Sequence, residues 1–213
     1  MISITGFWSR IRGLRRPPPE FVGYENLIAF ITNQNLLQMD GDLIEIGAYM
    51  GGGTVKLARL AARHRKRVYV IDTFNPDMDT TVSKSEVTAA EVYRAFLRGR
   101  SMWEVYRGAT RRMHNIITII EDSRKVVLDE DVRFVFGFVD GCHQKDCVRS
   151  DFHLVWPHLV PGGVLGFHDY EYTDWPEVTE ALADLMDEHR DEIRDTHEIV
   201  GSYDISSILL TKK

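Results

Sequence analysis

The feature that most constrains this chain is an apolar segment that runs into a glycine-rich turn and then into a helical pattern. Leu43–Ile46 has the composition of a short buried strand, the next seven residues include four glycines, and Thr54–Ala61 has helical composition. Four other segments have strand character, at residues 68–71, 116–120, 134–139 and 164–167. Because a crossover between parallel strands needs about the length of a helix, this alternation predicts a doubly wound, Rossmann-like α/β fold with a mostly parallel seven-stranded sheet and helices on both faces.

Apolar spacing predicts where the helices lie. An amphipathic helix is expected over residues 20–38, and the crossover before the fifth strand has an apolar face made of Val148, Phe152, Val155 and Leu159. A last helix is expected to carry Val178, Leu182, Leu185 and Ile193 on one side, before a closing strand at 205–210. The long connection over residues 75–115 is helix-compatible, and we expect it to form part of a substrate lid.

Length and charge limit the organisation and the function classes. At 213 residues the chain fits one domain, over residues 20–213, after a basic, proline-rich leader at residues 1–19. The formal net charge of −6 disfavours a nucleic-acid partner. No apolar run is long enough to span a bilayer and no secretory signal pattern is present, so we expect a cytoplasmic protein without stable membrane insertion. Whether it forms a homo-oligomer stays open.

The leader carries a cluster of positive charge ahead of three consecutive prolines. Its arginines are Arg10, Arg12, Arg15 and Arg16. Contact with a membrane or an acidic partner is one interpretation, and a solvated leader that ends at a stiff proline turn is the other and commoner one.

The glycine-rich turn has the properties of a ligand-binding loop. In EIGAYMGGGT, Gly47 allows a sharp turn after the strand, and Gly51–Gly53 let the backbone approach a ligand without a Cβ in the way. The unpaired N–H groups of the following helix favour a carboxylate or phosphate there. The spacing fits neither the dinucleotide fingerprint nor a P-loop. Asp72, nineteen residues after Gly53 and at the end of the second strand, suits the hydroxyls of a ribose.

Every predicted strand before the closing one ends in, or carries, a polar group. Ligands of open α/β sheets bind outside the carboxyl ends of the strands, where the strand order reverses. The groups at these ends are Glu45, Asp72, Glu121-Asp122, Asp140 and His168-Asp169.

Five segments together resemble one family. EIGAYMGGGT, VYVIDTF, IIEDS, FVDGCH and LVPGGVLGFHDY occur in the order and spacing of the class I S-adenosylmethionine-dependent methyltransferases, and the chain is most similar to the small-molecule O-methyltransferases of the macrocin and novobiocin type, over roughly residues 20–210. The resemblance implies that the glycine loop holds the methionine part of S-adenosylmethionine, that Asp72 holds the ribose, and that Asp122 with Ser123 borders the adenine. The cofactor-binding residues expected from it are Glu45, Gly47, Ala48, Tyr49, Gly51, Thr54, Asp72, Thr73, Asp122, Ser123 and Asp140.

A group of acids and histidines is expected beside the transferred methyl group. Asp140 and His143 follow the fourth strand, His168 and Asp169 follow the fifth, and neighbouring strands lie about 5 Å apart. In one reading, Asp140, His168 and Asp169 bind a divalent cation, Mg or Mn, that lowers the pKa of a substrate hydroxyl. In the other, His143 or His168 is a general base with a pKa near its ordinary value. The catalytic candidates are therefore His143, Asp140 and His168.

These residues predict an S-adenosylmethionine-dependent methyltransferase that acts on oxygen in a small hydroxylated substrate, with or without a metal ion. Two alternatives stay open. One is a non-catalytic module that binds S-adenosylmethionine or another nucleoside. The other is a nicotinamide-dependent oxidoreductase, which the Gly47-x-x-x-Gly51 spacing disfavours.

Overall fold

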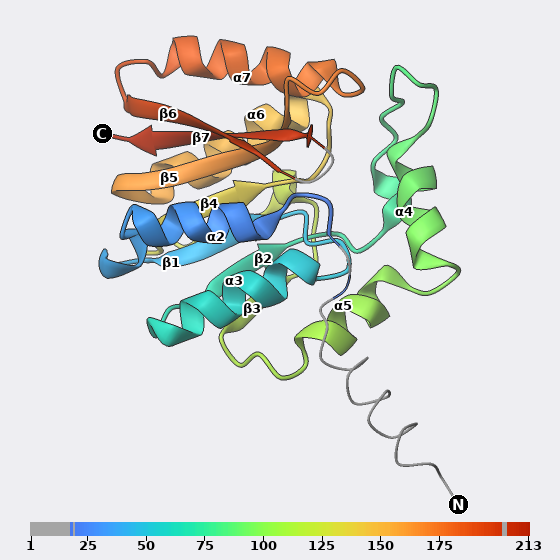
Figure 1. Ribbon diagram of the computed structural model, residues 1–213, viewed down its shortest axis with the longest axis horizontal. Coiled ribbons are helices and arrows are strands. Elements are labelled where there is room, and N and C mark those ends of the chain that lie inside the picture. The colour runs from blue at the N-terminus through green and yellow to red at the C-terminus, as the bar shows by residue number, and fades with distance from the viewer. Residues whose placement is uncertain (1–17, 19, 202–203) are drawn as a thin grey trace, which may run out of the picture.

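A twisted sheet of seven strands forms the centre of the protein, in the order β3-β2-β1-β4-β5-β7-β6 (Figure 1). The computed structural model describes residues 18, 20–201 and 204–213, so the predicted leader, apart from Pro18, lies outside the described residues. The strands are β1 (Asp42–Ile46), β2 (Val68–Ile71), β3 (Ile116–Ile119), β4 (Phe134–Val139), β5 (Leu159–Tyr170), β6 (Ile193–Val200) and β7 (Ser206–Lys212). Strands β1 to β5 are parallel, and β7 pairs antiparallel with both β5 and β6. The predicted mostly parallel sheet is confirmed.

Helices cover both faces of this sheet (Figure 1). They are α2 (Tyr24–Asn33), α3 (Gly52–Arg63), α4 (Ala89–Leu97), α5 (Met102–Thr110), α6 (Lys145–Val155) and α7 (Pro176–Glu188), with short 3-10 turns at η1 (Leu36–Gln38), η2 (Pro76–Met78), η3 (Ser123–Lys125) and η4 (Trp156–His158). Helices α2, α3 and α5 pack on one face, and α6 with α7 on the other. None of the helices in the described part of the chain has the length and apolar character required to cross a membrane.

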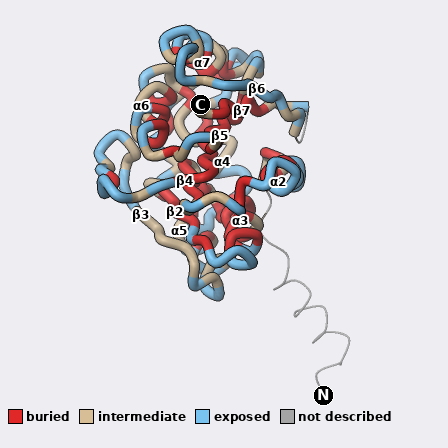
Figure 2. Tube along the Cα trace, turned by 90° about the vertical axis from the view of Figure 1, so that its left-hand side faces the viewer, coloured by how far each residue is buried: buried red, intermediate tan, exposed pale blue. Residues whose placement is uncertain are grey.

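Two hydrophobic cores hold the helices to the sheet. Successive side chains of a strand point to opposite faces, so Leu43 of β1 packs in the core under α2 and α3 while its neighbour Ile44 packs in the core under α6 and α7. Figure 2 shows the buried residues concentrated in the strands and on the inner sides of the helices. Three residues of the predicted apolar face, Val148, Phe152 and Val155, are buried on α6, whereas Leu159 begins strand β5.

Two predicted helices differ from the structure. The helix expected over residues 20–38 is shorter, because Gly23 and Asn35 adopt left-handed backbone conformations that separate α2 from its flanks. The last helix ends at Glu188, and Ile193, which was assigned to it, begins strand β6. Strand β6 was missed because it is an edge strand with mostly exposed side chains, so it lacks the apolar alternation that marks a half-buried strand.

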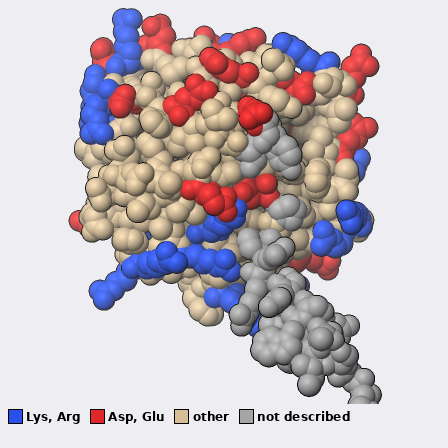
Figure 3. All heavy atoms as spheres, viewed as in Figure 1, with Lys and Arg blue, Asp and Glu red and all other residues tan. Residues whose placement is uncertain are grey.

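The sheet places the carboxyl ends of β1, β2 and β4 at one edge, on the side of α4 (Figure 1). Strand order reverses between β1 and β4, which is where open α/β sheets bind ligands. The opposite edge carries the end of α3. There Lys and Arg side chains form the lower left margin of the molecule in Figure 3, in the view of Figure 1. The two ends of the sheet therefore differ in chemistry.

Candidate active site

A cavity opens at the carboxyl ends of β1, β2 and β4. About 800 Å³ of empty space, part of it open to solvent, lies between its walls. Its walls come from the glycine loop, the segments after β2, β3 and β4, and α4. The polar residues of the lining are Tyr49, Asp72, Thr73, Asn75, Asp79, Tyr93, Glu121, Asp122, Ser123, Arg124, Asp140, Gln144 and Asp151.

The glycine loop turns directly behind β1. Gly47 has φ of +85°, and a Cβ there would lie 2.0 Å from the carbonyl oxygen of Asp140. No residue with a side chain fits this position, so the need for glycine anticipated from the sequence is met. Asp72 fixes the loop from the neighbouring strand, because its Oδ2 accepts hydrogen bonds from the backbone N–H groups of Ala48 and Tyr49, each at 2.8 Å.

Glu45 lies beneath the loop rather than in the cavity. Its side chain is fully buried, and its carboxyl group accepts hydrogen bonds from the hydroxyls of Tyr24 (2.6 Å) and Thr54. Burial raises the pKa of Glu45 to about 7, although both hydroxyls oppose this shift. Tyr24 can reach Glu45 because α3 carries Gly53 at the crossing, where a Cβ would lie 2.1 Å from the tyrosine ring. Glu45 and Thr54 are thus placed to support the loop from inside.

Glu45→Gln is expected to raise the free energy of unfolding more at pH 8 than at pH 5. The folded carboxyl has a pKa of about 7 against an ordinary 4.5, so its burial penalty develops as the pH rises from 4.5 through 7, and glutamine does not have that penalty. Glu45→Ala is expected to cost about 1–3 kcal/mol for each hydroxyl left without a partner. Urea unfolding of wild type and both variants at the two pH values measures this. Equal effects of glutamine at both pH values would contradict it.

The far end of the cavity is formed after β3 and by α6. Asp122 begins η3 and holds Arg124 through two carboxylate oxygens, with Nε–Oδ1 at 2.9 Å and Nη2–Oδ2 at 2.6 Å. Asp151 of α6 is 1% exposed, and its Oδ1 has no hydrogen-bond partner among the described residues. Burial raises the pKa of Asp151 to about 7. Asp151 therefore contributes a buried carboxyl group to the wall at this end of the cavity.

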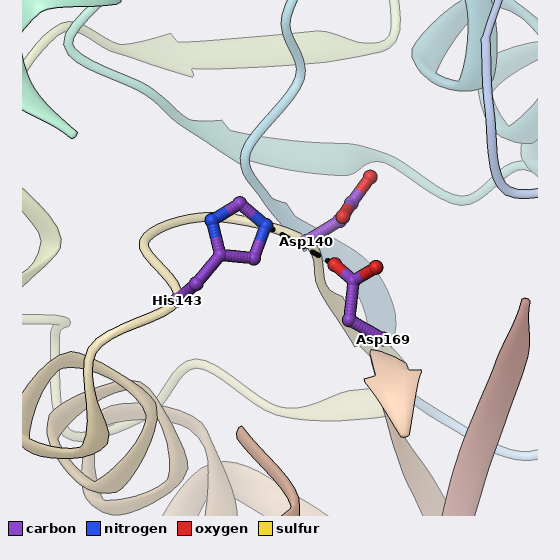
Figure 4. A group of neighbouring side chains, drawn as sticks. All are labelled: Asp140, His143 and Asp169. Carbon is purple, nitrogen blue, oxygen red and sulfur yellow. Dashed lines mark ion pairs between the residues drawn. The ribbon is translucent and has the colours of Figure 1, made fainter. Parts of the chain in front are cut away.

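A chain of acids and histidines lies beside the cavity, between β4, β5 and the segment after η2. His143 Nδ1 donates to Asp79 Oδ2 at 2.8 Å, and His143 Nε2 lies 3.1 Å from Asp169 Oδ2. His168 Nδ1 lies 3.1 Å from Asp140 Oδ1 and 3.2 Å from Asp169 Oδ2. Figure 4 shows His143 directed at Asp169, with Asp140 beside them; Asp140 and His143 lie in the segment after β4, and Asp169 lies near the end of β5. We call Asp79, Asp140, His143, His168 and Asp169 the acid–histidine cluster.

The carboxylates raise the pKa of both histidines of the cluster. Burial lowers the pKa of His143, but hydrogen bonds to Asp169 and Asp79 outweigh it and raise the pKa to about 10. His168 is raised to about 10 in the same way by Asp140 and Asp169. Burial opposes ionisation of Asp169, yet the two histidines hold the pKa of Asp169 well below its ordinary value. The expectation of a histidine base with an ordinary pKa is wrong for this arrangement, because every histidine of the cluster faces a carboxylate.

Asp79 is the member of the cluster that sequence reasoning missed. It is 7% exposed, and its own pKa is lowered because the bonds from His143 and Thr81 outweigh its burial. It lies in the long connection expected to form a lid, far from any strand end, so no local pattern marks it. Met78 and Tyr93, from the same connection, line the cavity. The connection therefore contributes both cavity wall and polar chemistry.

The structure brings most, but not all, of the sequence-predicted residues into one place. Those that line the cavity are Gly47, Tyr49, Asp72, Thr73, Asp122, Ser123 and Asp140. His143, His168 and Asp169 join Asp140 in the cluster next to it. Glu45, Ala48, Gly51 and Thr54 do not line the cavity. Among the described residues, the group whose ligand atoms all lie within 4.8 Å of one another is Asp140, His143 and Asp169, so it differs from the predicted metal set by one histidine.

Comparison with known proteins identifies the central part of the chain. Residues 44–170 match the family described as a methyltransferase domain, and this segment is more than half of the chain. It begins in β1 and ends with β5, and it contains the glycine loop, Asp72 and all five residues of the acid–histidine cluster. No curated protein sequence matches the chain.

Solved structures share the fold. The O-methyltransferase NovP is 14% identical, with a TM-score of 0.61, over 96% of this chain and 79% of that one. CalS11, a TDP-rhamnose 3'-O-methyltransferase of calicheamicin biosynthesis, is 16% identical, with a TM-score of 0.58, over 85% of this chain and 76% of that one. TomG from Streptomyces achromogenes, an O-methyltransferase in complex with SAM, is 17% identical, with a TM-score of 0.51, over 88% and 79%. At these identities the likeness is one of fold.

Proposed function

Because the chain belongs to the methyltransferase-domain family, we propose that it is an S-adenosylmethionine-dependent O-methyltransferase of a small hydroxylated molecule. The observation that carries this proposal is the single cavity wall that joins the glycine loop, Asp72 and Asp140 at the reversal of strand order. The similar folds of NovP, CalS11 and TomG, all O-methyltransferases, support transfer to oxygen. The family disfavours the nicotinamide-dependent alternative.

The cavity suits the cofactor at each of its ends. The close approach of backbone at Gly47 leaves room for the methionine part, and Asp72 and Thr73 lie where a ribose would follow. Ser123 and Asp151 lie where the adenine would end. When bound, S-adenosylmethionine supplies a methyl group on a positively charged sulfur.

The acid–histidine cluster is proposed to handle the proton of the acceptor hydroxyl. Asp140 lines the cavity, and its Oδ1 lies against His168. Its Oδ2 is therefore the oxygen that can accept a hydrogen bond from the substrate hydroxyl that receives the methyl group. Burial raises the pKa of Asp140, which makes this carboxylate a better proton acceptor, although His168 opposes the shift. His143 and His168, whose pKa values are raised, lie against Asp169 and Asp140 and would supply positive charge next to the carboxylate that accepts the proton.

A divalent cation fits the same cluster. Two carboxylates and one imidazole converge within 4.8 Å at Asp140, His143 and Asp169, and this mixed donor set suits Mn better than Mg. Each ring nitrogen of His143 now faces a carboxylate. A bound ion would take the place of the proton on one of these nitrogens, so binding would release a proton. When bound, the ion would lower the pKa of a coordinated hydroxyl.

Calorimetry with S-adenosylmethionine and with S-adenosylhomocysteine tests the proposal. We expect binding of both nucleosides in the micromolar range and no binding of reduced nicotinamide dinucleotide, which serves as the control for nonspecific nucleotide affinity. Formation of S-adenosylhomocysteine is then measured with a panel of catechols and deoxysugars, each with excess chelator or added Mn²⁺. Absence of binding for either adenosyl nucleoside would remove the proposal, and full turnover in chelator would remove only the metal-assisted form.

A further inference from the structure

Positive charge in this acidic protein is concentrated in two stretches of sequence. Residues 46–71 and 92–120 together contain twelve Lys and Arg but a single acidic residue, Glu104, although the whole chain has 32 acidic and 26 basic residues. A random distribution of these charges would place acids in both stretches. The separation indicates a surface with a charge opposite to that of the molecule as a whole.

The fold brings the ends of these two stretches together. Strands β2 and β3 are neighbours, with Val68 opposite Ile116, and the arginines that precede each strand therefore lie at the same amino edge of the sheet. Asn115 ties the two segments directly, since its Nδ2 donates to the carbonyl oxygens of Ala58 (2.9 Å) and Lys66 (3.1 Å). Helices α3 and α5 also pack against each other. The residues that we call the arginine patch are Arg59, Arg63, Arg65, Arg107, Arg111 and Arg112.

The charge of this patch is exposed and not neutralised. All six arginines are exposed, and none forms an ion pair with a carboxylate among the described residues. Some arginines elsewhere are paired, for example Arg67 with Asp42, Arg124 with Asp122 and Arg149 with Glu188. Figure 3 shows part of this positive margin along the lower left of the molecule, where Figure 1 places the end of α3. The patch therefore retains its full attraction for an anion.

The patch lies away from the cavity. Arg63, Arg65, Arg111 and Arg112 precede β2 and β3, whereas the cavity lies beyond the carboxyl ends of the strands, and none of the six arginines lines it. An occupied patch would leave the cavity open to a soluble substrate. Its function is thus separate from cofactor and acceptor binding.

We propose that the arginine patch docks the protein on an anionic lipid surface. Several arginines spread over two helices suit a diffuse layer of headgroups, to which each basic residue near the surface adds attraction. The segments that carry the patch, residues 56–67 and 107–115, contain no Phe, Tyr or Trp, so they lack the stacking surface used to bind single-stranded nucleic acid.

Flotation of the full-length protein with vesicles tests this proposal. We expect binding to vesicles of mixed phosphatidylcholine and phosphatidylglycerol at low salt, release at high salt, and no binding to phosphatidylcholine alone. The triple variant Arg63→Glu, Arg111→Glu, Arg112→Glu is expected to lose binding by roughly fivefold or more for each arginine removed. The triple variant should bind S-adenosylhomocysteine as tightly as wild type does. Unchanged binding would show that the variant is folded, and it would separate the loss of vesicle binding from the proposed enzymatic function.

A second triple variant controls for net charge. Arg98→Glu, Arg190→Glu and Arg194→Glu reverse three exposed arginines outside the patch, and this variant should bind the vesicles nearly as well as wild type. Equal loss in both variants would show general electrostatics and overturn the proposal. It would also be overturned by wild-type protein that ignores anionic vesicles, by binding that survives the patch variant, or by binding to polyuridylic acid in place of vesicles.

Discussion

Asp72→Ala is expected to weaken the binding of S-adenosylmethionine and S-adenosylhomocysteine by about 10- to 150-fold. The carboxylate accepts backbone hydrogen bonds from Ala48 and Tyr49 through Oδ2 and from Phe74 through Oδ1, and it is expected to accept the ribose hydroxyls as well. Hydrogen bonds to a charged group contribute roughly 1.5–3 kcal/mol, which gives this range. Titration calorimetry with both nucleosides measures the loss.

A second ligand separates the two roles of Asp72. If its carboxylate contacts the ribose, removing the 2'-hydroxyl from S-adenosylhomocysteine should weaken binding to wild type but have little further effect on Asp72→Ala. If Asp72 only holds the glycine loop, the loss on removing the hydroxyl will be the same in both proteins, and the assignment of Asp72 to the ribose would be wrong. Asp72→Asn, which keeps one acceptor oxygen, should fall between wild type and the alanine variant.

Asp169→Asn is expected to give the largest combined loss of activity and stability. The Oδ2 of Asp169 faces both His143 and His168, so the substitution leaves two buried imidazolium groups without their shared negative charge. Breaking a buried ion pair from one side costs about 3–5 kcal/mol, and loss of positioned acid–base groups lowers turnover by about two orders of magnitude or more. Urea unfolding and S-adenosylhomocysteine formation measure the two effects. Asp187→Asn, in an exposed pair with Arg190, is the control and should change neither.

The same cluster predicts how stability depends on pH. The folded pKa of His143 and His168 is about 10 against an ordinary 6.5, so their contribution is complete below pH 6.5 and is lost as the pH rises from 6.5 through 10. Asp169 and Asp79 have lowered pKa values, so they contribute above their ordinary 3.8 and lose this contribution as the pH falls below it. The combined contribution of these four groups should therefore be largest between about pH 4 and 6.5. In Asp169→Asn the loss on the alkaline side should be smaller, and an unchanged slope would refute the cluster as its source.

The sequence by itself determined the parallel sheet and the chemistry at its carboxyl edge. Strand length and alternation are local properties, so Leu43–Ile46, the glycine turn and the polar residue after each strand could be located without coordinates. Because parallel strands end at the same edge, the approach of Asp140 to His168 followed from topology alone. Strand β6 escaped because its exposed edge position leaves no apolar pattern.

Only the tertiary structure decided which partner each polar group takes. Asp79 reaches His143 across 64 positions of sequence, through a connection whose path no local pattern encodes. Glu45 turned out to lie beneath the loop, with Tyr24 as its partner, because α2 crosses α3 at Gly53. The protonation of His143 and the raised pKa of Glu45 depend on burial and on distances of about 3 Å between charges, and these distances exist only once the chain has folded.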